Sequence, residues 1–308
     1  MDIENTNNPV ERLVHLYEDG AFNRRELVRR IATYTGSIAT AIAALGAFAL
    51  PAEAQACPDD VRVPPDASDL ESEPVTFPGQ AGTVYGYLSR LRSLQVVPAQ
   101  PAVLVIHENR GLNDHIKDVT RRVARAGFVA LGIDLLSRAG GTDWYPDPAD
   151  ALAAYNSLNS QTHLEDMQSA VEFLRRMSFV DGSHLGAVGF CAGGGNCFNL
   201  AVTTPLQAAV VFYGAPPNPV EQVGSLAGPV LMIYAELDRG FTSRVPAAVT
   251  ALLQAEKTFG LHVYEGARHA FHNDTGALYN AEAACDAWAK TIAFFNRHLR
   301  PPADANEA

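Results

Sequence analysis

The sequence has little positive charge and few cysteines, and both shortages exclude classes of function. Its 308 residues include 23 Lys and Arg against 34 Asp and Glu, which gives a formal net charge of −11. Nucleic-acid binding draws its affinity from cations that release counterions from phosphates, so we do not expect this chain to bind nucleic acid. The four cysteines form no C-x-x-C pair and no zinc-type cluster with histidine. We therefore expect no metal site, no cofactor and no disulfide framework.

The N-terminal segment has the pattern of an export signal. Polar residues 1–23 precede the paired Arg24 and Arg25, residues 31–50 carry no charge, and small residues follow at 52–56. This order predicts a twin-arginine-like signal over 1–56, which the twin-arginine export machinery would recognise before release to the periplasm or the cell exterior. Two alternatives remain: a retained membrane anchor through 31–50 and an ordinary helix.

The rest of the chain alternates strand-like and helix-like segments. Residues 57–75 are rich in proline and acid and predict a linker or an extended arm, 76–300 form the main domain, and 301–308 are a tail. Short apolar runs predict strands at 83–88, 102–107, 128–133, 185–190, 208–213, 229–235 and 261–264. Helical patterns lie at 116–126, 164–177, 194–203, 245–257 and 279–299. The alternation predicts an α/β fold, a mostly parallel sheet with helices on both faces.

The strongest local motif follows the strand predicted at 185–190. It is Gly189-Phe190-Cys191-Ala192-Gly193, the G-x-S-x-G nucleophile elbow with cysteine in place of serine. The glycines flank a reversal where larger side chains would clash, and the nucleophile lies at a helix N-terminus, where the dipole favours a thiolate. The alternative is a glycine-rich turn with a buried, inert cysteine.

Two further residues follow later strands in the order that a hydrolase triad requires. Asp238 comes just after the strand at 229–235, and His269 comes just after the strand at 261–264. Nucleophile, acid and histidine in this chain order are typical of the α/β-hydrolase fold. Glu236 is a rival for the acid and His272 is a rival for the histidine. We predict that His269 takes the thiol proton of Cys191 and that Asp238 orients the imidazole.

These residues carry a resemblance to a known family. From about residue 75 to 299 the chain resembles the dienelactone hydrolases, or carboxymethylenebutenolidases. Four motifs in the family's order support it: Val105-Ile106-His107-Glu108-Asn109-Arg110-Gly111, Asp134-Leu135-Leu136-Ser137-Arg138, the elbow, and Ala267-Arg268-His269-Ala270-Phe271. The resemblance implies the α/β-hydrolase fold and cleavage of a small ester or enol lactone, with no cofactor.

The resemblance also implies roles for residues outside the triad. Glu108 matches a glutamate that keeps the resting cysteine a neutral thiol and accepts its proton when substrate binds; the alternative is a surface residue paired with Arg110. The oxyanion hole would consist of the backbone N–H of Ala192 with that of Glu108 or Asn109.

The substrate-binding residues are less well matched. Arg138 matches an arginine that binds the substrate carboxylate, with a surface arginine as the alternative. The family's second such arginine is absent, because His272 and Asn273 follow His269, so dienelactone itself is in doubt. His272 or Asn273 is expected to hydrogen-bond an uncharged or differently shaped group of the substrate instead. Trp144 and Tyr145 are expected to line the pocket, unless they only pack in a cap.

The sequence therefore predicts an exported, monomeric ester or lactone hydrolase that uses Cys191. A general carboxylesterase or another α/β-hydrolase activity, such as that of a peptidase, is the alternative, followed by a non-catalytic binding module on a hydrolase fold. Cys197 lies on another face of the helix that follows Cys191, and Cys285 is expected in the core of the last helix.

Overall fold

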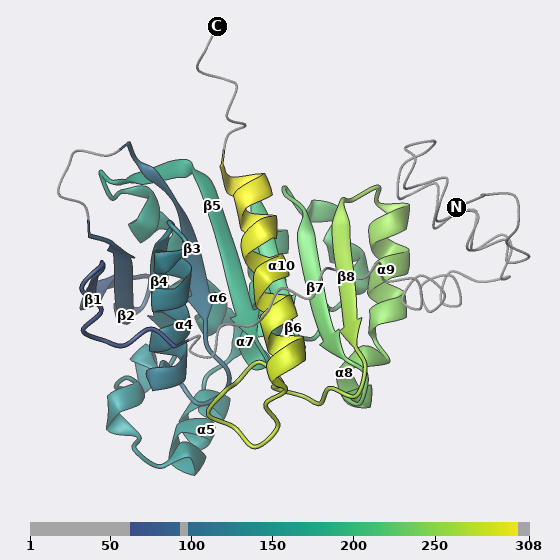
Figure 1. Cartoon of the computed structure of the whole chain (residues 1–308), viewed down its shortest axis with the longest axis horizontal. Helices are drawn as coiled ribbons and strands as arrows, with labels where there is room; N and C mark the ends of the chain where they lie inside the picture. Colours follow the sequence, from purple (N-terminus) through teal and green to yellow (C-terminus); the bar gives the residue numbers. More distant parts are fainter. Residues whose placement is uncertain (1–61, 93–97, 301–308) are drawn as a thin grey trace, which may run out of the picture.

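A single eight-stranded sheet organises the chain. The computed structural model describes residues 62–92 and 98–300, and Figure 1 shows the sheet between two layers of helices. In chain order the strands are β1 (Leu70–Gly79), β2 (Gly82–Leu91), β3 (Gln100–Ile106), β4 (Val129–Asp134), β5 (Val180–Phe190), β6 (Ala208–Phe212), β7 (Val230–Ala235) and β8 (Phe259–Tyr264). The spatial order is β1-β2-β4-β3-β5-β6-β7-β8.

The sheet is parallel from β4 through β3 to β8, and β2 runs antiparallel to both of its neighbours. Parallel strands require crossover helices, and these helices cover both faces of the sheet. The helices are α4 (Asp114–Arg125), α5 (Pro148–Ser157), α6 (Ser160–Arg175), α7 (Ala192–Thr203), α8 (Arg239–Thr242), α9 (Val245–Gln254) and α10 (Ala281–Leu299). Short 3₁₀ turns are η2 (Ser137–Ala139), η3 (Thr142–Trp144) and η4 (Val220–Ser225). This architecture is that of an α/β hydrolase and confirms the expected fold class.

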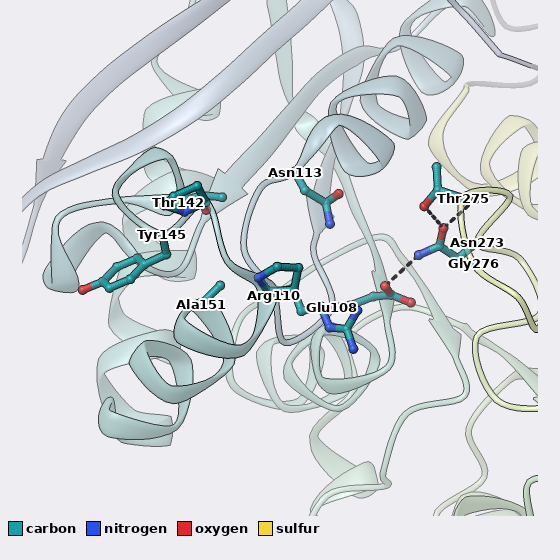
Figure 2. Close-up of a pocket in the computed structure, with 11 residues that line it drawn as sticks. Glu108, Arg110, Asn113, Thr142, Tyr145, Ala151, Asn273, Thr275 and Gly276 are labelled. Atoms are coloured by element: carbon teal, nitrogen blue, oxygen red, sulfur yellow. Dashed lines mark hydrogen bonds between the residues drawn. The ribbon is translucent and has the colours of Figure 1, made fainter.

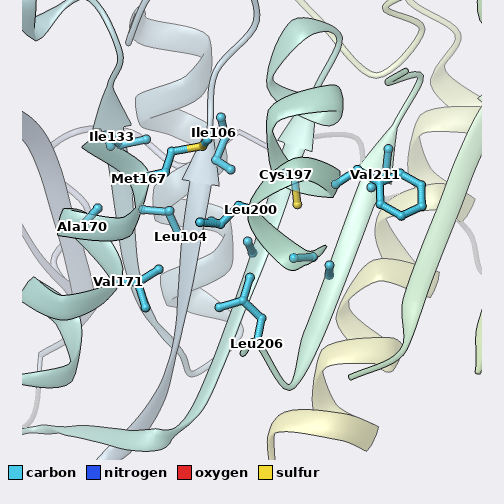
Figure 3. Close-up of a cluster of buried hydrophobic side chains, with 14 of the residues drawn as sticks. Leu104, Ile106, Ile133, Met167, Ala170, Val171, Cys197, Leu200, Leu206 and Val211 are labelled. Atoms are coloured by element: carbon cyan, nitrogen blue, oxygen red, sulfur yellow. The ribbon is translucent and has the colours of Figure 1, made fainter. Parts of the chain in front are cut away.

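Side chains alternate across the sheet and build a core on each face. Leu104 and Ile106 of β3 pack with α6, α7 and α9 on one face, a cluster shown in part in Figure 3. Val103 and Val105 of the same strand pack with α4 and α10 on the other face. Both faces of a parallel sheet are buried, which explains the unbroken apolar runs of these strands in the sequence.

All seven predicted strands and all five predicted helices are present, while β1, α5 and α8 had no counterpart among the predicted elements. The linker or extended arm predicted over 57–75 overlaps β1, which begins at Leu70 and pairs with β2 along its whole length. Val63 is also buried, at 3% exposure. β1 is an edge strand. Its buried residues are Leu70 and Phe77, and proline and acidic residues lie between them. Such a strand lacks the apolar signal of the central ones.

The signal predicted over 1–56 and the tail at 301–308 lie outside the described residues. None of the helices between residues 62 and 300 that the structure describes is long and apolar enough to span a bilayer.

Candidate active site

The turn between β5 and α7 holds Cys191 in a strained conformation. Its φ is 57° and its ψ is −118°, an arrangement that few residues other than glycine adopt. A Cβ at Gly189 would lie 1.9 Å from the carbonyl oxygen of Gly193, and a Cβ at Gly193 would lie 2.2 Å from that of His107. No side chain fits at either position, so both glycines are required for the turn that presents the Cys191 side chain at the end of the sheet.

Three of the predicted site residues come together at this end of the sheet. The Nε2 atom of His269 lies 3.0 Å from the Sγ atom of Cys191. The Nδ1 atom of His269 lies 2.5 Å from Oδ2 of Asp238. Asp238 precedes α8 but makes no side-chain capping bond there, so its carboxylate is free to accept from the imidazole. This arrangement can remove a proton from the sulfur and stabilise the resulting imidazolium.

The two rival residues do not reach Cys191. Glu236 accepts a hydrogen bond from the backbone N–H of Gly266, at 2.8 Å. His272 is 1% exposed and its ring packs against the rings of Phe190 and Trp288. Phe241 stacks on the imidazole of His269 at 5.0 Å between ring centroids, and this packing restricts the orientation of the ring.

The thiol of Cys191 is held in its neutral form. Burial raises the pKa of Cys191 to about 11, and the negative charge of Glu108 adds to that shift. The backbone N–H of Ala192 hydrogen-bonds the sulfur and works in the opposite direction, as does the charge of Arg110. The helix N-terminus thus favours the thiolate as expected, but desolvation and the charge of Glu108 outweigh it in the resting enzyme.

Glu108 follows β3 and faces Cys191 from the neighbouring strand end. Its Oε2 atom accepts a hydrogen bond from Nδ2 of Asn273, at 2.9 Å. Its Oε1 atom is buried and has no hydrogen-bond partner within the described residues. Arg110, the alternative partner considered from the sequence, forms no ion pair or hydrogen bond in the part of the chain that the structure describes. A carboxylate with one unpartnered buried oxygen is suited to receive a proton.

The expected oxyanion donors come from two adjoining segments. The N–H of Ala192 is the first of α7 and has no acceptor within that helix. The chain at Ile106 and His107 approaches the start of α7 so closely that only glycine fits at position 193. Glu108 and Asn109 follow directly on that segment, which brings their backbone near the elbow.

A cavity of about 290 Å³ adjoins Glu108 and is shown in Figure 2. Glu108 and Arg110 enter it from the loop after β3, while Asn273 and Thr275 enter from the loop after β8. The remaining lining residues come from the residue before α4, from the segment between β4 and α5, from α5 itself and from the loop after β8: Asn113, Thr142, Tyr145, Pro146, Pro148, Ala151 and Gly276. Among the residues that the structure describes, Arg110 is the only cation that lines this cavity, and Glu108 is the only carboxylate.

Of the substrate-binding residues expected from the sequence, Asn273 and Tyr145 line this cavity, whereas Arg138, His272 and Trp144 lie elsewhere. The guanidinium of Arg138 pairs with the buried carboxylate of Asp166 and points toward the β1–β2 turn. His272 is enclosed in the core, where burial lowers its pKa well below the ordinary value. Trp144 is 76% exposed and borders a shallower surface hollow beside α5. The contacts that draw Arg138 and His272 away from the cavity are with residues distant in the sequence, so the local sequence does not reveal them.

Sequence reasoning also missed two residues that hold the site together. Asn273 was considered only as a substrate ligand, yet its amide binds Glu108. His107 was treated only as part of a motif, yet its Nδ1 donates to the carbonyl of Glu108 and its Nε2 accepts from the N–H of Leu135, at 2.9 Å. Both ring nitrogens are thus used, and burial lowers the pKa of His107, which keeps the ring neutral. Its place directly before Glu108 was the only hint in the sequence.

The remaining cysteines differ from one another. Cys197 is fully buried and free, and its thiol approaches the carbonyl of Val210 at 3.5 Å. Cys285, which was expected in the core, is half-buried and disulfide-bonded. Within residues 62–92 and 98–300, no group of three or more His, Cys, Asp or Glu side chains is arranged to hold a metal ion.

Comparison with known proteins agrees with this architecture. The model of the dienelactone hydrolase family matches residues 91–299. A protein of Saccharolobus solfataricus, provisionally named a carboxymethylenebutenolidase, is 34% identical over 243 residues, which cover 68% of this chain and 95% of that protein. A similarly named protein of Methylorubrum extorquens is 31% identical over 76% of this chain and 83% of its own length.

Solved structures give the same result. A crystal structure from Klebsiella pneumoniae, provisionally titled a dienelactone hydrolase, superposes with a TM-score of 0.68 at 29% identity and covers 74% of this chain and 99% of that chain. A dienelactone hydrolase-like promiscuous phosphotriesterase from metagenomic libraries superposes with a TM-score of 0.65 at 26% identity, over 75% of this chain and all of that chain. With the fold and the elbow described above, these matches show that the chain belongs to the dienelactone hydrolase family, whose members hydrolyse carboxylic esters and lactones.

Proposed function

We propose that this protein hydrolyses a small ester or lactone through a covalent thioester on Cys191. The observation that supports it most is the continuous contact from Sγ of Cys191 through His269 to Asp238, at 3.0 and 2.5 Å. In this proposal Cys191 is the nucleophile, His269 the general base and acid, and Asp238 the group that orients the imidazole.

The first half of the reaction begins with a neutral thiol. Because the pKa of Cys191 is raised to about 11, the sulfur must lose its proton when substrate arrives, to His269 or to the unpartnered oxygen of Glu108. The sulfur then bonds to the carbonyl carbon, and the carbonyl electron pair moves to oxygen. The N–H of Ala192, with that of Glu108 or Asn109, stabilises this oxyanion.

The second half regenerates the enzyme. The tetrahedral intermediate collapses, the bond between carbon and the leaving oxygen breaks, and this oxygen takes the proton that left the sulfur, from the imidazolium of His269 or from the protonated carboxyl of Glu108. In a lactone the leaving oxygen stays attached to the acyl chain. Water then gives a proton to His269 and attacks the thioester, and the sulfur leaves as a thiol. The products are a carboxylic acid and an alcohol or enol.

The lining of the cavity favours a small substrate with a carboxylate. Arg110 offers a guanidinium that has no partner in the described part of the chain, while Asn113 and Thr275 offer further polar groups. Arg138 is already paired with Asp166. We therefore assign anion binding to Arg110, whose planar guanidinium suits a carboxylate.

The test of the nucleophile is a panel of aryl esters and enol lactones given to the wild type and to Cys191→Ala. We expect kcat/KM to fall at least about 1000-fold in the variant. The matched control is Cys197→Ala, which removes a buried cysteine of the same helix and should retain activity. Unchanged turnover in Cys191→Ala would remove this cysteine from the mechanism. A wild-type enzyme that binds these compounds without cleaving them would support a binding module.

The test of the anion site compares a carboxylate-bearing ester with its neutral amide analogue in Arg110→Gln. Loss of one charge-assisted hydrogen bond corresponds to a KM about tenfold higher for the anionic ester alone. An equal change in KM for the carboxylate-bearing ester and for its neutral amide analogue would instead favour a general carboxylesterase.

We also propose that residues 1–56 export the folded enzyme through the twin-arginine machinery and that the mature chain acts as a monomer. The disulfide of Cys285 supports export, since disulfides persist in oxidising compartments. A reporter fused to residues 1–60 should be exported, and Arg24→Lys with Arg25→Lys should stop it. Continued export would argue against this route, and a reporter that stays in the membrane fraction would favour an anchor through 31–50. Gel filtration of the mature chain tests the monomer.

A further inference from the structure

The residues just before β1 are docked on helix α4. The backbone N–H of Val63 donates to Oδ1 of Asp118 at 2.7 Å, and Nε of Arg121 donates to the carbonyl of Val63 at 2.6 Å. Val63 itself is 3% exposed. We call residues 62 and 63 the arm. These backbone bonds fix its position on the helix.

Asp274 joins this arm and α4 to the loop between β8 and α10. Arg62 of the arm donates from Nε to the Asp274 carboxylate at 3.0 Å and from a terminal nitrogen to its carbonyl at 2.7 Å. From α4, Arg122 donates to the carboxylate at 2.7 Å, and Nδ1 of His115 lies 3.1 Å from it. Burial opposes ionisation, but the hydrogen bond from His115 and the charge of Arg122 hold the pKa of Asp274 below its ordinary value. The carboxylate is therefore charged at neutral pH.

The preceding residue in the chain, Asn273, reaches the catalytic side of the loop. Its Oδ1 accepts from both the N–H and the hydroxyl of Thr275, at 3.0 and 2.6 Å. Its Nδ2 therefore points away from Thr275 and donates to Glu108, as Figure 2 shows. This is the only hydrogen bond to the Glu108 carboxylate within the described residues. Asn273 thus determines where that carboxylate lies.

We propose that Asp274 is a positioning residue: held by Arg62 of the arm and Arg122 of α4, it keeps Asn273 bonded to Glu108 and so fixes the Glu108 carboxylate beside Cys191. The inference rests on the function proposed above for Glu108. It makes docking of the arm, which follows soon after the predicted export signal, a condition for a complete active site.

Loss of this positioning is expected to change how easily the Cys191 thiol ionises, which depends on the charged groups around it. The titratable and charged groups that face this thiol are Glu108, Arg110, Tyr155, Tyr213, Asp238 and His269. Of these, Glu108 and Asp238 disfavour the thiolate and Arg110 favours it. A Glu108 carboxylate released from Asn273 spends less time beside the sulfur. The thiol then ionises more easily, while the proton acceptor needed for turnover is no longer in place.

The decisive variant is Asp274→Asn in the full enzyme. The measurements are the alkylation rate of Cys191 by iodoacetamide against pH, read from the Cys191 peptide by mass spectrometry, and kcat and KM on an aryl ester. We expect alkylation at pH 7.5 to be about threefold to tenfold faster, which corresponds to a pKa lower by up to about one unit, and kcat to be about tenfold lower. If Asp274 had a purely structural role, Asp274→Asn would lower Tm and leave the alkylation profile of the folded enzyme unchanged.

Two more variants keep the inference falsifiable if Asp274→Asn folds poorly. Arg62→Ala removes a side chain that is 58% exposed, so the variant should still fold. We expect alkylation of Cys191 to be about twofold to threefold faster and kcat to be lower by a similar factor. Asp69→Asn is the matched control. It breaks the ion pair of Asp69 with Arg125, which also joins α4 to the residues before β1 but does not involve the loop, and it should leave the alkylation profile unchanged.

A double-mutant cycle shows whether Asp274 acts through Asn273. Asn273→Ala with Asp274→Asn should match Asn273→Ala alone, because both changes release Glu108. Additive effects, or a wild-type alkylation profile in Asp274→Asn and Arg62→Ala, would overturn the inference. Glu108→Gln separates the two proposals. If Glu108→Gln leaves the alkylation profile unchanged, the proposed role of Glu108 is contradicted. If Glu108→Gln shifts the profile and the Asp274 and Arg62 variants do not, only the positioning role of Asp274 is contradicted.

Discussion

Two arginines at the catalytic end of the sheet differ in what surrounds them. Arg138 is 11% exposed and is bound to a fully buried carboxylate, that of Asp166. Arg110 is exposed, lines the cavity and has no partner among the described residues. A charge that already neutralises a buried partner cannot also bind substrate without leaving that partner unpaired. Arg138 is therefore engaged with a buried partner, whereas Arg110 is the arginine that we propose for binding the substrate.

Arg138→Met should destabilise the protein without changing substrate affinity. Removing one member of a buried ion pair costs about 3 kcal/mol, because Asp166 is left without its cation. Urea unfolding checks the stability, and KM for a carboxylate-bearing ester checks the affinity. Adding Asp166→Asn should recover part of the loss, since the uncompensated charge is then removed. A higher KM with unchanged stability would return Arg138 to the binding site.

At the scale of elements, the unit that matters is β5, its turn and α7. The strand ends in the sheet core, Cys191 adopts a positive φ, and the helix begins at once with Ala192. The close approach of the chain at Ile106 and His107 to Gly193 joins this unit to the end of β3. Nucleophile and predicted oxyanion donors are thus held by backbone packing. Substitutions here should affect stability and activity together.

Gly193→Ala should lower both the activity and the melting temperature. Its Cβ would lie 2.2 and 2.5 Å from two carbonyl oxygens, and backbone atoms cannot rotate away. Overpacking of this kind costs about 1–3 kcal/mol, which corresponds to a Tm lower by roughly 5–10 °C in a domain of this size. Gly195→Ala is the matched control on the same helix, because its Cβ would meet no atom closer than 3.5 Å. It should be neutral or slightly stabilising, because alanine has the higher helix propensity, and equal losses in both variants would show that the close contacts at Gly193 are not the cause.

At the scale of the whole molecule, burial keeps several histidines neutral. Burial lowers the pKa of His107 and His272, and it lowers that of His163 to about 4. An unfolded chain binds protons at these residues near pH 6.5, while the folded protein does not. Their contribution to stability is therefore fully present above pH 6.5 and is lost progressively as the pH falls toward the folded pKa.

The free energy of unfolding should thus decrease between pH 7 and pH 5. For His163 alone the loss at pH 5 is about 2 kcal/mol, from the difference between pKa values near 6.5 and 4. Urea unfolding at several pH values measures it. His163→Gln should be less stable at pH 7 but should show a shallower dependence on pH. An equal slope in wild type and variant would show that His163 does not titrate on unfolding.

The sequence alone determined the elements and the order of the site. The central strands are buried on both faces, so their apolar runs marked them directly, and the elbow glycines marked the turn because no other residue fits. The edge strand β1 was missed because proline and acidic residues interrupt its apolar pattern. Local apolar patterns report which segments are buried strands. Cys191, Asp238 and His269 could be located because each follows such a strand.

Only the tertiary structure decided which neighbouring side chains face the cavity. Arg138 finds Asp166 on α6, and Asp274 finds Arg62 from a point 212 residues earlier in the chain. His272 turns into the core, while Asn273 beside it turns to Glu108. Successive loop residues point in different directions, and whether a charge is free depends on partners far away in the chain. That information arises when the chain packs, so no motif contains it.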